Sequence, residues 1–121
     1  MEKVLNKKYL GNHILAEFWE CDIEILNNVT LVQQHMEEGV KRANATFVKS
    51  VFHQFSPIGI SGVVVIQESH FAIHTWPEHA YAAVDLFTCN LGMEYIKAYD
   101  YLVDKFKSKK HSYKLHKRGA F

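Results

Sequence analysis

The chain has 121 residues, of which 48% are hydrophobic and 22% charged, values typical of one folded domain over residues 1–121 rather than of a disordered protein. Its formal net charge of +1 at pH 7 gives no overall indication of nucleic-acid binding. No apolar run approaches the ~20 residues that a membrane-spanning helix needs, so the sequence predicts no membrane span.

The first third of the chain predicts a strand and an amphipathic helix after a polar lead-in. Residues 1–11 are polar and carry several lysines, and we expect them to be mobile. Alternating side chains over residues 12–20 predict a strand with Ile14, Ala16 and Phe18 on one face. Asp22 is a suitable N-cap for the following helix, which is expected to start irregularly around Asn27 and Asn28. The apolar stripe of this helix is Ile25, Val29, Val32, Met36 and Val40.

The middle third has the two-residue period of β-strands. Strands are predicted over residues 46–55 and 61–67, joined by the turn formed by residues 56–59. A further strand follows Glu68 and Ser69 and is stopped by Pro77. Residues 81–89 form the next predicted strand.

The last third predicts a helix over residues 92–107 and a final strand over residues 112–116. The apolar side of the helix carries Ile96, Tyr99, Leu102, Val103 and Phe106. The order of the elements indicates an α+β fold, a two-layer sandwich in which two helices cover one face of a mainly antiparallel sheet.

The second face of this predicted sheet is rich in aromatic and small side chains. They are Trp19, Ala72, Trp76, Tyr81, Ala83 and Phe87. A large exposed aromatic surface usually marks an interface. We therefore predict that another protomer covers this face, most simply in an isologous dimer.

Basic residues gather near the C-terminus, and no acidic residue follows Asp104. They are Lys105, Lys107, Lys109, Lys110, Lys114, Lys117 and Arg118. The favoured interpretation is a solvated helix end stabilised by the helix dipole, and a polyanion site is the alternative.

The two cysteines and eight histidines allow two further interpretations. No secretory segment precedes Cys21 and Cys89, so we expect free thiols in a reducing cytoplasm, with Cys21 structural. Cys89 and His74 could face the same side of the sheet, which leaves a cysteine hydrolase open, although no local signature supports it. A metal site is not predicted, because His70 and His74 would lie roughly 13 Å apart along a strand.

Ser69 is the first candidate for a nucleophile, because it stands between two predicted strands with histidines close after it. A simple turn serine is the alternative. Four blocks of sequence surround or accompany it, namely HILAEFWECD (13–22), FSPIGISGVVVI (55–66), ESHFAIHTWPE (68–78) and AVDLFTC (83–89). In this order they closely resemble the small prokaryotic S-adenosylmethionine decarboxylases over roughly residues 11–119.

This resemblance implies a proenzyme that cleaves itself between Glu68 and Ser69 into a β chain of residues 1–68 and an α chain of residues 69–121. Ser69 would become a pyruvoyl group, a covalent cofactor that forms a Schiff base with the substrate amine and withdraws electrons as carbon dioxide leaves. The product of this family is the aminopropyl donor for spermidine synthesis.

The resemblance also implies roles for individual residues in cleavage and catalysis. The Ser69 hydroxyl would attack the Glu68 carbonyl, His74 would remove the Ser69 α-proton, and Ser61 would hydrogen bond the oxyanion. Cys89 would be the proton donor to the substrate carbanion.

For substrate binding, the resemblance implies that Phe55 stacks on adenine and that Glu78 accepts hydrogen bonds from the ribose hydroxyls. Trp19 and Glu20 could complete the pocket.

The chain departs from the family pattern at three places. The segment after Gly119 ends at Phe121 and is shorter than in many relatives. Trp19 stands where relatives often have a smaller aromatic residue, and Gln67 precedes the cleavage pair where small residues are common. Homologues on this scaffold decarboxylate ornithine or arginine, so a pyruvoyl-dependent decarboxylase of those amino acids is the alternative function. A non-catalytic, ligand-binding dimeric homologue is the alternative of another class.

Overall fold

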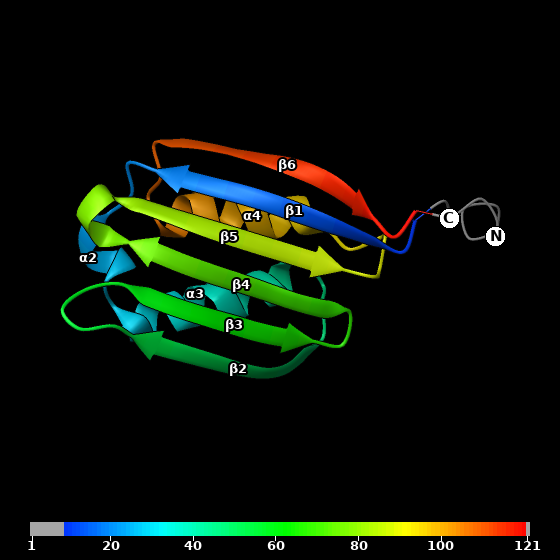
Figure 1. The fold of residues 1–121 in the computed structure, drawn as a ribbon, viewed down its shortest axis with the longest axis horizontal. Helices are drawn as coiled ribbons and strands as arrows, with labels where there is room; N and C mark the ends of the chain where they lie inside the picture. The colour runs from blue at the N-terminus through cyan, green and yellow to red at the C-terminus, as the bar shows by residue number, and fades with distance from the viewer. Residues whose placement is uncertain (1–8, 121) are drawn as a thin grey trace.

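Six antiparallel strands form one sheet in the order β2-β3-β4-β5-β1-β6, and helices cover one of its faces (Figure 1). The computed structural model describes residues 9–120, so most of the predicted mobile lead-in lies outside the described residues. The strands are β1 (Gly11–Trp19), β2 (Phe47–Gln54), β3 (Ile60–Ile66), β4 (Ser69–Trp76), β5 (Tyr81–Thr88) and β6 (Lys110–Arg118). The predicted α+β two-layer sandwich is confirmed.

The helical layer consists of α2 (Ile23–Leu26), α3 (Val29–Arg42) and α4 (Tyr95–Lys105), and a short 3-10 helix, η1 (Pro77–His79), follows β4. Asp22 caps α2 as predicted, because its carboxylate accepts a hydrogen bond from the Ile25 amide at 3.1 Å. The irregularity predicted at Asn27 and Asn28 is a break between two helices. Asn28 starts the second of them by accepting a hydrogen bond from the Leu31 amide.

Two elements, α4 and β6, differ most from their predicted ranges. Helix α4 begins only at Tyr95, because residues 90–93 form a turn in which the Met93 amide donates to the Asn90 carbonyl. Strand β6 is longer than predicted, since it pairs with β1 over its whole length, from Gly11 opposite Arg118 to Trp19 opposite Lys110. All of its side chains are exposed, so its ends left little trace in the hydrophobic pattern.

The core lies between the helices and the inner face of the sheet. The alternation predicted for β1, β4 and β5 is confirmed, and each fully buried Leu, Ile or Phe there contributes about 1.5–3 kcal/mol to stability. The largest fully buried side chains include Ile14, Phe18, Met36, Phe71, Ile73, Leu86, Leu102 and Phe106. The prediction for Ile96 was wrong, because the buried stripe of α4 passes through Ala98, Tyr99 and Leu102 and leaves Ile96 39% exposed.

Gly62 makes room in this core for the ring of Phe52, which lies opposite it on β2. A Cβ at position 62 would lie only 2.1 Å from Phe52 Cδ2. We therefore expect Gly62→Ala to lower the free energy of unfolding by about 1–3 kcal/mol. Urea unfolding of uncut chains carrying Ser69→Ala would measure this. Gly92→Ala is the matched control, because its Cβ would meet only the Asn90 side chain at 3.5 Å. Equal stability of both variants would contradict the close packing at Gly62.

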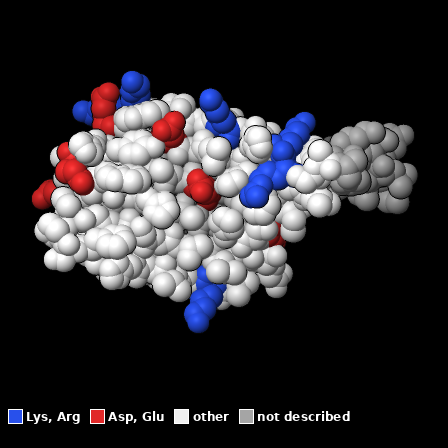
Figure 2. All heavy atoms as spheres, viewed as in Figure 1, with Lys and Arg blue, Asp and Glu red and all other residues white. Residues whose placement is uncertain are grey.

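The outer face of the sheet is open in the protomer and largely uncharged. Figure 2 views the molecule from this side and shows charged side chains mainly around the rim, with an acidic one near the centre. Several large apolar side chains are exposed on this face or its edges, among them Leu15, Val51, Val65 and Trp76. Within residues 9–120 no helix is long and apolar enough to cross a membrane.

Candidate functional site

Glu68 and Ser69 lie at a tight turn between β3 and β4. Ile66 pairs with Ser69 in the antiparallel ladder, so Gln67 and Glu68 form the tip of the hairpin. The Gln67 amide donates to the Thr46 carbonyl at 2.9 Å, which ties the tip to the residue before β2. The predicted position of the Glu68–Ser69 bond between two strands is therefore confirmed.

Both ends of Glu68 are held in place. Its carboxylate accepts hydrogen bonds from the Thr46 amide at 3.0 Å and the Thr46 hydroxyl at 3.1 Å. The Thr46 amide is the main reason that the pKa of the Glu68 carboxyl lies below its usual value. The Glu68 carbonyl accepts a hydrogen bond from the Cys89 amide at 2.8 Å. That amide polarises the carbonyl and would stabilise an oxyanion formed on it.

The backbone at Ser69 has an unusual conformation. Its φ angle is 147°, in a region that residues with a side chain rarely adopt. Such conformations cost about 1–3 kcal/mol and occur mainly at functional sites. Breaking the peptide bond before Ser69 would free this torsion, so the strain would favour the expected cleavage at this point.

The two cysteines have different environments. Cys89 follows β5 directly and is exposed, and its neighbour Thr88 is paired with Ser69, so the residue lies beside the turn. Cys21 is buried, and burial raises the pKa of its thiol to about 11. Cys21 therefore stays protonated near neutral pH, as expected for a structural thiol, and Cys89 is the accessible one.

A second group of polar side chains lies at the other end of the sheet. Ser61 and His74 are paired residues of β3 and β4, and Ser61 Oγ lies 2.8 Å from His74 Nδ1. Both line a hollow of about 210 Å³ together with the two predicted substrate-binding residues, Phe55 and Glu78. A larger hollow of about 390 Å³ lies between α3 and the start of β2, away from both groups.

An aromatic row continues from this hollow across the outer face. The rings of Trp76 and Tyr81 are 5.5 Å apart, and those of Tyr81 and Trp19 are 5.7 Å apart. The Tyr81 hydroxyl donates to Glu17 at 2.8 Å, and burial together with this carboxylate raises the pKa of Tyr81 to about 12. Trp19 thus lies at the same end of the sheet as the hollow, with Glu20 exposed just beyond it.

The two groups are separated within one protomer. Ser69 and His74 lie on β4 roughly 16 Å apart along the strand. His74 is paired with Ala83, which places Cys89 roughly 20 Å away from it along β5. Within one protomer, Ser69 therefore lies near Cys89 at one end of the sheet. Ser61 lies near His74, Phe55 and Glu78 at the other end, and the two groups are not in contact. A Cys89–His74 pair, as a cysteine hydrolase needs, does not form within the protomer.

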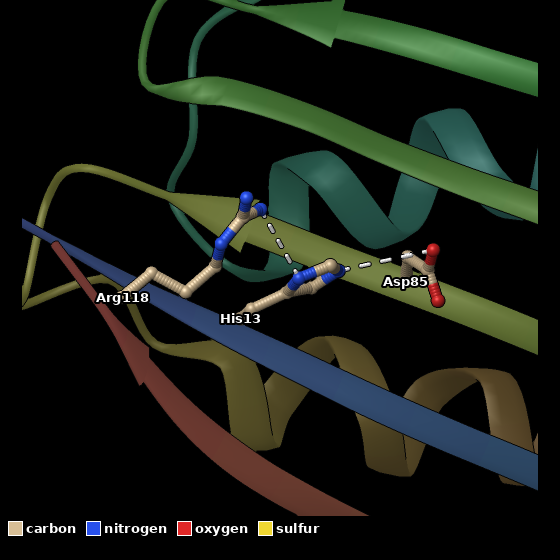
Figure 3. A network of polar contacts seen from close by, with 3 residues as sticks. All are labelled: His13, Asp85 and Arg118. Carbon is tan, nitrogen blue, oxygen red and sulfur yellow. Dashed lines mark hydrogen bonds and ion pairs between the residues drawn. The ribbon is translucent and has the colours of Figure 1, made fainter.

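Close to the Ser69 end of the outer face, His13 lies between an acidic and a basic side chain (Figure 3). Its Nδ1 lies 3.5 Å from an Arg118 nitrogen, and its Nε2 lies 3.8 Å from an Asp85 oxygen. The second distance is too long for a hydrogen bond, and this buried Nε2 has no partner among the described residues. Burial lowers the pKa of His13 despite the nearby Asp85, so the ring is neutral near pH 7.

Sequence reasoning missed two contributors to the site. Thr46 holds the Glu68 carboxylate, and the Cys89 amide donates to the Glu68 carbonyl. Both contacts were missed because neither residue is close to Glu68 in the sequence. Only the register of β4 with β5 could have indicated the second contact. Among the described residues, no group of three His, Cys, Asp or Glu side chains could hold a metal ion.

Comparisons with known proteins show which family the chain resembles. The chain matches a family model described as S-adenosylmethionine decarboxylase over residues 12–119. It is 50% identical over 114 residues to the S-adenosylmethionine decarboxylase proenzyme of Thermotoga petrophila, which covers 94% of this chain and 88% of the relative. It is 52% identical over 112 residues to the proenzyme of Acetivibrio thermocellus, covering 93% and 90%.

Solved structures give the same result. The crystal structure of the adenosylmethionine decarboxylase from Aquifex aeolicus matches with a TM-score of 0.86 and 38% identity, over 94% of both chains. An AdoMetDC monomer from Trypanosoma brucei matches with a TM-score of 0.63 over 84% of this chain and 44% of that one. Because its identity is only 17%, this second likeness shows the fold alone.

Proposed function

Because the chain belongs to the S-adenosylmethionine decarboxylase family, we propose that it is a proenzyme that cleaves itself before Ser69 and then decarboxylates S-adenosylmethionine. The products of cleavage are a β chain of residues 1–68 and an α chain of residues 69–121. The observation that carries the proposal is the hydrogen bond that the Glu68 carbonyl accepts from the Cys89 amide at 2.8 Å. The next residue, Ser69, has a φ angle of 147°.

Cleavage uses only groups of the chain and water. The Ser69 hydroxyl adds to the Glu68 carbonyl carbon, the carbon–nitrogen bond breaks, and the amide becomes an ester with a free amine on Ser69. The Cys89 amide is positioned to stabilise the oxyanion in this step. A base then removes the Ser69 α-proton and Glu68 leaves as a carboxylate. The remaining dehydroalanine takes up water and loses ammonia, which leaves a pyruvoyl group.

His74 is the proposed base, and Ser61 sets its tautomer. When His74 Nδ1 donates to Ser61 Oγ, the lone pair is on Nε2, which can accept the α-proton. The distance along β4 prevents His74 from serving Ser69 of its own protomer. We therefore propose that the base comes from a second copy of the chain.

A homodimer with the outer sheet faces in contact would complete the site. In an isologous dimer each end of one sheet can lie against the opposite end of the other, so the Ser69 and Cys89 end would meet the partner's hollow. Exposed aromatic and aliphatic side chains on this face support the contact. The hollow of about 210 Å³ is also smaller than the ~300–1,000 Å³ of complete ligand sites, as expected for half of a shared pocket.

The residues around the turn suit a pyruvoyl cofactor made from Ser69. Such a group would supply an electrophilic carbonyl for the substrate amine and an acceptor for the electron pair released as carbon dioxide leaves. Cys89 is the exposed thiol beside position 69 and is the proposed proton donor to the substrate α-carbon. Phe55 would stack on adenine and Glu78 would accept hydrogen bonds from the ribose, since both line the same hollow as His74.

Trp19 is a further proposed contributor to the pocket through the aromatic row, and Glu20 lies next to it. The product, decarboxylated S-adenosylmethionine, would supply aminopropyl groups for spermidine. We place the enzyme in the cytoplasm, a location that the two free thiols support.

Release of labelled carbon dioxide tests the substrate. We expect the cleaved protein to decarboxylate S-adenosylmethionine and to leave ornithine and arginine unchanged, because Phe55 and Glu78 match a nucleoside and not a short amino acid. Equal or faster release from ornithine or arginine would move the assignment to the alternative decarboxylase. Binding without cleavage or release would support the non-catalytic homologue instead.

A further inference from the structure

Asn27 lies in the break between α2 and α3, far from the reacting groups in sequence. Its neighbour Asn28 has an ordinary role, since its side chain caps α3. The Asn27 side chain instead reaches the loop between β2 and β3. Its Oδ1 accepts hydrogen bonds from Gln54 Nε2 at 2.8 Å and from the Gly59 amide at 3.0 Å. One carboxamide oxygen therefore holds both ends of that loop.

The loop of residues 55–59 forms one wall of the hollow. Phe55, Ile58 and Gly59 line it together with His74 and Glu78. The Phe55 amide donates to the Gly59 carbonyl at 2.8 Å, which closes the base of the loop. Gly59 has a φ angle of +106°, a conformation open mainly to glycine. The loop has no secondary structure of its own, so its position depends on contacts such as those of Asn27.

A second contact, which is buried, ties the same helix break to the sheet. The Thr75 hydroxyl donates to the Leu26 carbonyl at 2.9 Å and accepts from the Ile60 amide at 3.0 Å. Thr75 also lines the hollow. The end of α2 is thus held against the sheet, and the hydrogen bonds of Asn27 hold the loop that carries Phe55 against the end of α2.

We infer that Asn27 is a positioning residue for nucleoside binding, acting through the loop that presents Phe55. This inference rests on the proposed function, because it assigns Phe55 to the adenine ring. Asn27 does not touch the reacting atoms, so it should affect substrate affinity more than turnover.

Three variants test the inference. Asn27→Ala removes the shared acceptor, and we expect the KM for S-adenosylmethionine to rise about tenfold, with kcat and self-cleavage within about twofold of the unmodified protein. Asn27→Asp keeps an acceptor oxygen for both donors, so its KM should stay within about threefold. Asn28→Ala is the matched control, because it removes a helix cap next door and lowers the melting temperature without touching the loop.

Binding of 5′-methylthioadenosine gives a readout that does not depend on catalysis. This nucleoside lacks the amine and carboxylate of the substrate, and its Kd should rise about tenfold in Asn27→Ala and stay unchanged in Asn28→Ala. If Asn27→Ala does not fold, Gln54→Met removes one of the two donors at an exposed strand end, and a rise of about threefold is expected.

Three results would overturn the inference. They are an unchanged KM in Asn27→Ala, an equal rise in Asn28→Ala, or a fall in kcat with constant KM. Activity of the unmodified protein separates these from failure of the proposed function. If the unmodified protein is active, the ratio of the variant KM to the unmodified KM tests the positioning role of Asn27. If the unmodified protein does not decarboxylate S-adenosylmethionine, both proposals are wrong.

Discussion

Replacing Ser69 by alanine is expected to leave one uncut chain of 14.0 kDa and to abolish decarboxylation. The unmodified protein should instead give two fragments that separate before position 69, with the second blocked at its N-terminus by the pyruvoyl group. The reason is that alanine keeps the turn but lacks the hydroxyl that attacks the Glu68 carbonyl. Denaturing mass spectrometry after incubation at neutral pH measures the outcome directly.

Ser69→Cys is the matched variant for this experiment. It replaces one nucleophilic atom by another, so cleavage should continue through a thioester in place of the ester. Persistence of cleavage in Ser69→Cys and its loss in Ser69→Ala would attribute the break to the side-chain nucleophile. Full activity of Ser69→Ala would sink the proposed mechanism.

The sheet and its faces could be predicted because burial imposes a period of two on β1, β4 and β5. Phe71 and Ile73 are fully buried and His70 and His74 are not, as the alternation indicated. Strand β6 lacked this signal, because its side chains are exposed and backbone pairing with β1 determines its length. The extent of a strand with no buried side chain cannot be obtained from hydrophobicity.

The residues of the candidate site could be proposed from the sequence, whereas their arrangement in space could not. The blocks of sequence led us to propose Ser61, Ser69, His74 and Cys89 as site residues. Their positions in the sequence did not reveal that Ser69 and His74 lie far apart along β4 within one protomer. The register of the sheet places Ser61 beside His74, and the Cys89 amide against the Glu68 carbonyl. Long-range pairing of this kind depends on the whole sheet, as does the contact between Asn27 and Gly59.

Co-expression of Ser69→Ala with His74→Ala is expected to restore decarboxylation, although each variant alone is inactive. In a mixed dimer, the His74→Ala chain contributes an intact Ser69 and its partner contributes an intact His74. One of the two shared sites is then complete. Random assortment makes half of the dimers mixed, so about a quarter of the unmodified activity should return.

Mass spectrometry adds a second readout, because cleavage must occur only in the His74→Ala chain, which retains Ser69. Co-expression of Ser69→Ala with Cys89→Ala is the matched control. Both changes lie at the same end of the sheet, so each shared site lacks either the nucleophile or the thiol, and turnover should not return.

Inactivity of the first mixture, with mixed dimers demonstrated by differently tagged chains, would place His74 and Ser69 in one protomer after all. The structure would then have to bring two positions of β4 together across roughly 16 Å, which an extended strand paired on both sides cannot do without breaking its ladder. The strand geometry therefore makes a site shared between protomers the simplest way to bring His74 to Ser69.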